Sequence, residues 1–196
     1  MSLVDRQKFD LIKSKYGHYA SWAIWDEAGS MPKSNVGNLQ VLDPDKNDSL
    51  LSQLNSNVVM VGLNISGKIS VPLGNFHAKT SSAQDYKIRY AFQGTQFWGA
   101  YMTDIIKDFE EKVSGKMMKY MKENPSFLTE NIQIFLEELN DLEAKDPVLI
   151  AFGVDTFNLL KSSLGNRFNI KKVTHYSHFI SKEQYRDEVL NLTVNS

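Results

Sequence analysis

The 196-residue chain contains no cysteine, and this absence excludes a group of site chemistries. Disulfide scaffolds, thiolate zinc sites, cysteine nucleophiles and cysteine-bound iron–sulfur clusters all need thiols. Any catalysis by this chain must therefore use oxygen, nitrogen or backbone groups.

A surplus of charge of either sign is also absent. The 22 basic and 23 acidic residues give a formal net charge of −1, so no overall field attracts the phosphates of nucleic acid. A DNA-binding surface would need a local basic patch, although scattered lysines are most often ordinary solvated charges. The candidates are Lys68; Lys79, Lys87 and Arg89; and Arg167, Lys171 and Lys172.

Long apolar runs are missing as well, because none approaches the roughly 18 residues that span a bilayer. The chain begins with charged residues, so we expect neither secretion nor membrane insertion, and we expect a cytoplasmic protein. The length and the 42% hydrophobic content fit a single domain over residues 1–196 that folds without disulfides or a structural metal. Nothing in the pattern specifies an oligomer.

Short apolar, β-branched runs alternate with helical periodicities, which is typical of α/β proteins. Strands are predicted at 57–64, 100–106, 147–152 and 169–174. A short N-terminal helix around residues 5–13 is predicted to stop near Gly17, and further helices are predicted around 48–54, 83–92, 126–142, 155–164 and 182–192. We expect a left-handed cap at Gly17, a helix cap at Ser126, and a capping box formed by Ser181 with Gln184. The pattern predicts a three-layer αβα fold with a central, mostly parallel sheet of about four strands.

Polar side chains follow the predicted strands, and the carboxyl ends of parallel strands meet in one crevice. The residues at these ends are Asn64, Thr103 with Asp104, Gly153, and His175 with Tyr176. An amide and an imidazole at two strand ends could face each other across such a crevice. The alternative is structural: an asparagine after a strand often binds its own backbone, and a histidine in a loop is usually a surface residue.

Two of these strand ends carry motifs of a known family. Gly62-Leu63-Asn64-Ile65-Ser66 resembles the first active-site motif of the uracil-DNA glycosylase superfamily, and His175-Tyr176-Ser177 resembles the second, which is usually His-Pro-Ser. The segment 94–98 resembles an Asn-Arg-Phe-Trp element of the mismatch-specific branch, and 99–107 and 147–153 resemble strands of the family. Order and spacing agree from about residue 57 to 179. Ile65 and Tyr176 stand where the two motifs normally carry proline, so the chain looks like a divergent member.

The resemblance implies cleavage of a base–sugar bond after the nucleotide has swung into a pocket. Asn64 would orient the water, and His175 would donate a hydrogen bond to the departing base. The base pocket would be lined by the following residues: Gly62, Leu63, Ser66, Phe76, His77, Tyr176 and Ser177. Phe76 would stack on the base, with core packing as the alternative, and Tyr176 or Phe179 would enter the DNA stack, with local packing as the alternative.

The implied partner is DNA, a nucleobase or a nucleotide. The main alternative is a non-catalytic binding protein that keeps the same fold and pocket. Asp104 with His77, His175 and His178 matches no metal-ligand spacing, so no metal is expected. No phosphate-cradling glycine run follows a strand, so no cofactor is expected either. Ser66 does not lie in the Gly-x-Ser-x-Gly elbow of serine hydrolases.

Overall fold

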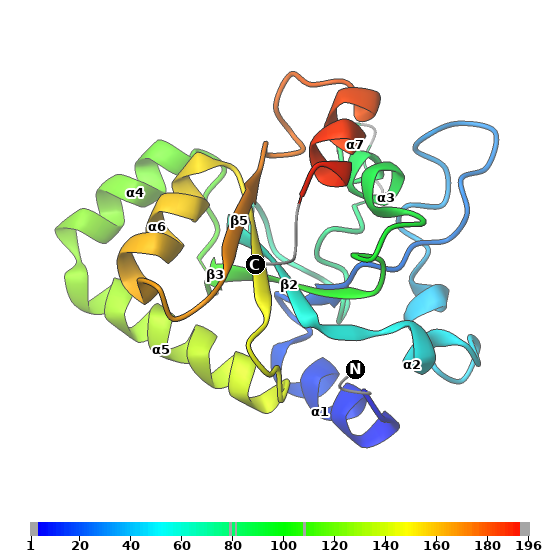
Figure 1. The fold of residues 1–196 in the computed structure, drawn as a ribbon, viewed down its shortest axis with the longest axis horizontal. Helices are drawn as coiled ribbons and strands as arrows, with labels where there is room; N and C mark the ends of the chain where they lie inside the picture. The colour runs from blue at the N-terminus through cyan, green and yellow to red at the C-terminus, as the bar shows by residue number, and fades with distance from the viewer. Residues whose placement is uncertain (1–3, 79, 81, 108, 193–196) are drawn as a thin grey trace.

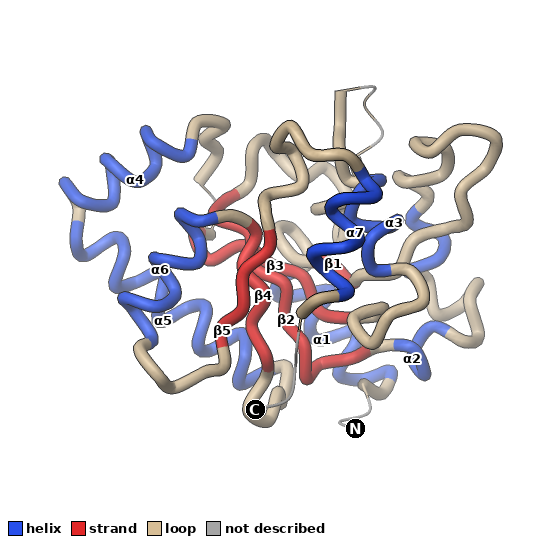
Figure 2. The backbone as a smooth tube through the Cα atoms, turned by 45° about the horizontal axis from the view of Figure 1, so that its top comes forward, coloured by secondary structure: helices blue, strands red, loops and turns tan. Residues whose placement is uncertain are grey.

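A five-stranded sheet forms the centre of the computed structural model, which describes residues 4–78, 80, 82–107 and 109–192. The strand order is β1-β3-β2-β4-β5 (Figure 2). The strands are β1 (Ser21–Trp22), β2 (Asn55–Asn64), β3 (Ala100–Ile106), β4 (Val148–Phe152) and β5 (Ile170–Val173). Only β1 runs antiparallel, along β3, and the other neighbours pair in parallel. The predicted mostly parallel α/β sheet is confirmed, but the strand count of about four was too low.

Helices cover both faces of this sheet (Figure 1). On one face pack α1 (Arg6–Tyr16), α4 (Ser114–Glu123), α5 (Pro125–Asp141) and α6 (Val154–Leu164), and on the other α3 (Tyr86–Phe92) and α7 (Lys182–Leu190). The short helix α2 (Leu50–Gln53) precedes β2, and a 3-10 turn, η1 (Leu39–Leu42), lies between β1 and α2.

Side-chain alternation divides the core of the central strand between the two faces. Val59 and Val61 of β2 face the α1, α5 and α6 side, whereas Val58 and Met60 face the α3 and α7 side. Successive side chains of a strand point to opposite faces, so Gly62 follows Met60 onto the α3 and α7 face. This alternation decides which residues of the first motif lie on the same face of the sheet and can therefore belong to one site.

Some predicted element ends differ from the structure. Gly17 has φ −60° and ψ −13°, so the expected left-handed cap is wrong, because its N–H still bonds in helical fashion to Lys13. Pro125 begins α5, and no side chain caps it, so the expected cap at Ser126 is wrong too. Proline at the first helical position needs no N–H partner. The capping box of Ser181 and Gln184 is confirmed.

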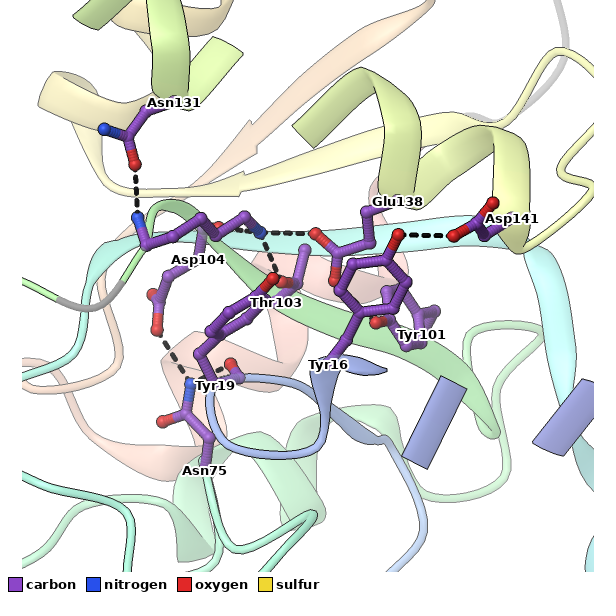
Figure 3. A network of polar contacts seen from close by, with 10 residues as sticks. Tyr16, Tyr19, Asn75, Tyr101, Thr103, Asp104, Asn131, Glu138 and Asp141 are labelled. Carbon is purple, nitrogen blue, oxygen red and sulfur yellow. Dashed lines mark hydrogen bonds and ion pairs between the residues drawn. The ribbon is translucent and has the colours of Figure 1, made fainter. Parts of the chain in front are cut away.

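A buried ion pair fastens α5 to the sheet (Figure 3). The side chains of Lys107, which follows β3, and Glu138 of α5 are 3% and 0% exposed, and Lys107 Nζ donates to Glu138 Oε2. Tyr101 Oη donates to the other carboxylate oxygen at 2.5 Å, and Lys107 Nζ also donates to Thr103 Oγ1 at 2.9 Å. The backbone N–H of Lys107 donates to Asn131 Oδ1 at 2.6 Å. Both charges are thus paired and hydrogen-bonded, as buried charges require.

Removing one partner of this pair is expected to destabilise the protein strongly. Lys107→Met leaves the Glu138 carboxylate buried without its cation, which costs about 3–5 kcal/mol of unfolding free energy. Urea denaturation monitored by circular dichroism measures this loss. The matched control is Lys119→Met, because Lys119 and Glu123 form an exposed pair at 3.8 Å that is worth about 1 kcal/mol or less. Equal losses in the two variants would contradict a structural role for the buried pair.

Candidate functional site

The candidate site lies at the carboxyl edge of the sheet, on the face covered by α3 and α7. The parallel register pairs Gly62 with Asp104, so the ends of β2 and β3 bring these two residues side by side. A Cβ on Gly62 would lie 2.1 Å from Asp104 Oδ1 and 3.5 Å from the Phe76 ring. Only glycine permits this approach of the carboxyl group to the backbone. Gly62 of the first motif is therefore closely packed against the Asp104 carboxyl group and the Phe76 ring.

Asp104 is a buried carboxyl group with an unusual environment. Its side chain accepts a hydrogen bond from Asn75 Nδ2 at 2.7 Å (Figure 3), and the residue is only 3% exposed. Burial raises the pKa of Asp104 to about 7, against smaller lowering contributions from Asn75 and Lys107. A carboxyl group that changes protonation near neutral pH can exchange protons with a ligand or a water.

Three aromatic rings form a wall beside this carboxyl group. The ring of Phe76 lies 5.9 Å from that of Phe152 and 6.4 Å from that of Tyr176, and the rings of Phe152 and Tyr176 lie 5.4 Å apart. Phe76 is 5% exposed and has φ 62°, a left-handed conformation that is uncommon for a bulky residue. The backbone N–H of Phe76 donates to Asn75 Oδ1 at 3.1 Å, so one asparagine supports both the ring and Asp104.

Tyr176 belongs to this wall and also stacks on His175. The two rings lie 4.4 Å apart at an interplanar angle of 21°. Burial, followed by the charges of Asp85 and Asp104, raises the pKa of Tyr176 well above its usual value, so its hydroxyl stays protonated. Burial also raises the pKa of Asp85 to about 6. The tyrosine ring thus occupies the apolar space between Phe76, Phe152 and the imidazole.

His175 is held in one tautomer by its own loop. The backbone N–H of Ser177 donates to His175 Nδ1 at 3.2 Å, and Ser177 Oγ lies 2.8 Å from the same nitrogen. A nitrogen that accepts a hydrogen bond from an N–H carries no hydrogen, so the neutral ring carries its hydrogen on Nε2. Burial, with a contribution from His178, lowers the pKa of His175 to about 4. The ring is therefore a neutral Nε2–H donor at physiological pH.

Asn64 lies at the same edge of the sheet but uses its amide nitrogen to hold a loop. Its Nδ2 lies at hydrogen-bond distance from the backbone oxygens of Ile65 (2.9 Å), Phe109 (3.0 Å) and Glu111 (2.8 Å). The orientation of the amide is fixed by these carbonyls. Strand β4 separates β2 from β5, so the strand ends that precede Asn64 and His175 are two strand spacings, roughly 10 Å, apart.

The other predicted pocket residues are distributed over several environments. Leu63 is 8% exposed and packs in the core of the opposite face, as strand alternation requires. Ser66 is exposed in the loop after β2, and Ser177 is exposed beside His175. His77 is 3% exposed and bonds through Nε2 to the backbone oxygen of Trp22 at 3.3 Å, with its ring 5.1 Å from that of Trp25. Burial lowers the pKa of His77 to about 4.

The basic residues around α3 serve loops rather than an open surface. Lys87 and Arg89 are 6% and 3% exposed. Arg89 donates to the backbone oxygens of Asp26, Ser34 and Pro32, at 2.9, 2.8 and 2.6 Å. Lys79 lies outside the described residues. The predicted patch of Lys79, Lys87 and Arg89 is therefore not a solvated basic surface in the part that the structure describes.

The structure adds three residues to the candidate site that belong to neither of the two motifs, namely Asp104, Asn75 and Phe152. Asp104 was expected among the polar residues at the strand ends, and Phe152 could have been found from the end of the buried run 147–152. Asn75 carried no signal, because its contacts reach Tyr19 and Asp104, which are 56 and 29 positions away. The residues that the structure brings together are Gly62, Asn75, Phe76, Asp104, Phe152, His175, Tyr176 and Ser177.

Two open hollows lie on the described surface, one next to the loop that carries His175 and one on the opposite face of the sheet. One of about 510 Å³ lies between the loop after β5 and α7, where Thr174, Phe179 and Glu188 contribute to its lining. Another of about 490 Å³ is lined by residues of α1 and α5 and by Arg167. Within the described residues no group of three or more His, Asp or Glu side chains could hold a metal ion. No helix among them is both long and apolar enough to cross a membrane.

The ionisation of Asp104 gives a testable pH dependence of stability. The pKa is 3.8 as the reference value and about 7 in the folded protein, so between these values the folded state holds a proton that the unfolded state has lost. Stability from this group is complete below pH 3.8 and is lost as pH rises to about 7. Asp104→Asn should gain stability relative to the parent protein over this range, by on the order of 2–4 kcal/mol at pH 8.

Urea titrations at several pH values measure this difference, with Asp48→Asn as an exposed control that should show none. A constant difference between pH 4 and pH 8 would contradict the raised pKa of Asp104.

The comparisons with known proteins add no relative to this picture. No family model, no curated protein and no solved structure matches the chain. The resemblance to the uracil-DNA glycosylase superfamily therefore depends on the two motifs and on their order.

Proposed function

We propose that the chain is a cofactor-free hydrolase of the uracil-DNA glycosylase type, which cleaves the bond between a base and its sugar. The substrate is a base in nucleic acid or a free nucleoside or nucleotide. The observation that carries the proposal is the state of His175, a neutral imidazole whose Nε2–H is the donor. A departing base accumulates negative charge, and a fixed neutral donor stabilises it without first having to be protonated.

Three further features support this chemistry. The aromatic wall of Phe76, Phe152 and Tyr176 suits a flat heteroaromatic ring. Asp104 changes protonation near neutral pH and can accept a proton from the attacking water or bind a polar edge of the base. Asn64 uses Nδ2 for the loop carbonyls, so Oδ1 is the atom with which it would orient a water.

Contact with a nucleic acid is supported by one exposed aromatic residue. Phe179 has a relative exposure of 110% and lies in the loop that carries His175. An exposed ring next to a base pocket can fill the gap that a flipped nucleotide leaves in the stack. With a net charge of −1, such binding would be weak and strongly dependent on salt.

Removal of the imidazole donor tests the proposal directly. In a panel of oligonucleotides and nucleosides with uracil or deaminated bases, His175→Ala is expected to lower base release about 100- to 1,000-fold. Asn64→Ala should also abolish measurable release. The control is His178→Ala, which removes an exposed imidazole of the same loop, 6.4 Å from His175, and should retain activity within a few-fold. If the parent protein releases no base from any substrate at high enzyme concentration, the hydrolase proposal is wrong.

The second candidate function is a non-catalytic binding protein, and the position of Tyr176 favours it. The ring of Tyr176 already occupies the space between Phe76, Phe152 and His175, which we call the aromatic slot, and it stacks on the ring of His175. A base can enter the same space only after this ring has moved. A protein that holds a base without turnover needs this movement once for each bound ligand, whereas a hydrolase needs it in every turnover.

Emptying the slot separates ligand binding from catalysis. Tyr176→Ala removes the ring, and we expect free uracil, hypoxanthine or another base to raise the melting temperature of this variant more than that of the parent. A ligand at 100 times its Kd stabilises by about 2.7 kcal/mol. Phe179→Ala is the control, because it removes an exposed ring from the same loop. Absence of stabilisation of Tyr176→Ala by any base would show that the slot does not take a nucleobase.

A further inference from the structure

The loop that carries His175 is held at both ends by charged side chains from helices. Glu188 of α7 binds Thr174, directly before His175, and Lys87 of α3 binds the backbone of His178. We propose that Glu188 is a positioning residue for His175, with Lys87 as the support at the far end of the loop. The proposal rests on the proposed function, because it concerns the same imidazole.

Glu188 makes a two-point contact with Thr174. The backbone N–H of Thr174 donates to Glu188 Oε2 at 2.8 Å, and its hydroxyl donates to Oε1 at 2.8 Å. Both contacts are charge-assisted, which makes them stronger than neutral hydrogen bonds. Two contacts from one carboxylate fix the orientation of Thr174 as well as its position. The next residue along the chain is His175, so its backbone starts from a fixed point.

The strand before Thr174 and the glycine after β4 restrict His175 from the other side. Gly153 N–H donates to the backbone oxygen of Val173 at 2.9 Å. A Cβ on Gly153 would lie 3.3 Å from His175 Cβ, which is tighter than usual contact, and Gly153 has φ +89°. The imidazole therefore has one side against the end of β4, and the Glu188 contact holds it there.

Lys87 holds the far end of the same loop. Its Nζ donates to the backbone oxygen of His178 at 3.2 Å, and the residue is only 6% exposed. His178 N–H in turn donates to the backbone oxygen of His175 at 2.9 Å, which closes the turn. The loop is thus fixed at Thr174 and at His178, and the Ser177 N–H between them reaches His175 Nδ1.

The two supporting helices act together because they are joined to each other. Arg186 of α7 donates to the backbone oxygens of Tyr90, Ala91 and Gln93 at the end of α3, at 2.6, 3.3 and 3.0 Å. The rings of Phe92 and Tyr185 lie 6.4 Å apart in the same interface. Figures 1 and 2 both show α3 and α7 lying side by side, beneath the loop that follows β5.

The chemistry of the contact allows a conservative rescue. In Glu188→Gln, the amide oxygen can accept from Thr174 N–H while the amide nitrogen donates to the threonine hydroxyl, which also accepts hydrogen bonds. Glu188→Ala loses both contacts. Thr174→Val keeps the side-chain shape and the N–H but loses the hydroxyl. The three variants therefore keep both contacts, lose one or lose both, and none of them changes the imidazole itself.

The test combines nitrogen NMR of the His175 ring with base-release kinetics. The parent protein and Glu188→Gln should show a single neutral tautomer with hydrogen on Nε2. Glu188→Ala should show a mixture of tautomers and a kcat reduced about 100-fold, because small misplacements of a catalytic group cost this much. Thr174→Val should lie between them. Glu183→Ala on the same helix is the control, because Glu183 is exposed and forms an ion pair with its neighbour Lys182.

Two outcomes would overturn the inference, and a third would separate it from the proposed function. A single Nε2–H tautomer and unchanged kcat in Glu188→Ala would show that the contact does not position His175. If Glu188→Ala fails to fold, an unchanged tautomer and kcat in both Thr174→Val and Lys87→Met would show the same. If the parent protein releases no base while Glu188→Ala still redistributes the tautomers, the proposed function fails and the positioning role of Glu188 stands.

Discussion

The parallel pairing of β2 with β3 and β4 is the constraint on which every group of the candidate site depends. It places Gly62 opposite Asp104, and the parallel pairing of β4 with β5 brings the end of β4 beside the start of the His175 loop. Parallel strands end at one edge, so residues more than a hundred positions apart reach the same edge of the sheet. A shift of β2 by one residue would turn Gly62 away from Asp104 and would put a side chain where the carboxyl group now lies.

Lys107 and Asp104, the two ionisable groups near the end of β3, contact different partners on opposite faces of the sheet. Lys107 Nζ reaches Glu138 on the α5 side, while Asp104 turns toward Asn75 on the other face (Figure 3). The cation therefore neutralises Glu138 and lowers the pKa of Asp104 only in part, so burial dominates and the pKa is raised. If Lys107 paired with Asp104 instead, that carboxyl group would stay ionised and could not take up a proton near pH 7.

The sequence predicted the long regular elements well, because their signals are local. The apolar runs of β2, β3 and β4 and the capping box of α7 are examples. The two residues of β1 are too few to show alternation, and α4 carries only Met117 and Met121 as fully buried residues. Strand alternation also explains why the side chain of Leu63 packs on the opposite face of the sheet, while Gly62 faces the candidate site. Contacts such as that of Asn64 with Phe109 and Glu111 depend on tertiary structure and carry no local signal.

In the proposed hydrolase, turnover depends on how the ring of Tyr176 can move. The loop is fixed at Thr174 and His178, so displacement of the ring by rotation of its side chain costs less than displacement of the backbone. Such a rotation would uncover the face of His175 on which Tyr176 now stacks, without moving the Nδ1 contact with Ser177. A base could then take the place of the tyrosine ring against the same imidazole. The second motif usually carries proline in this position, whose small ring would not stack over the imidazole as Tyr176 does, so under the proposed function tyrosine at 176 makes access to the imidazole depend on a side-chain rotation.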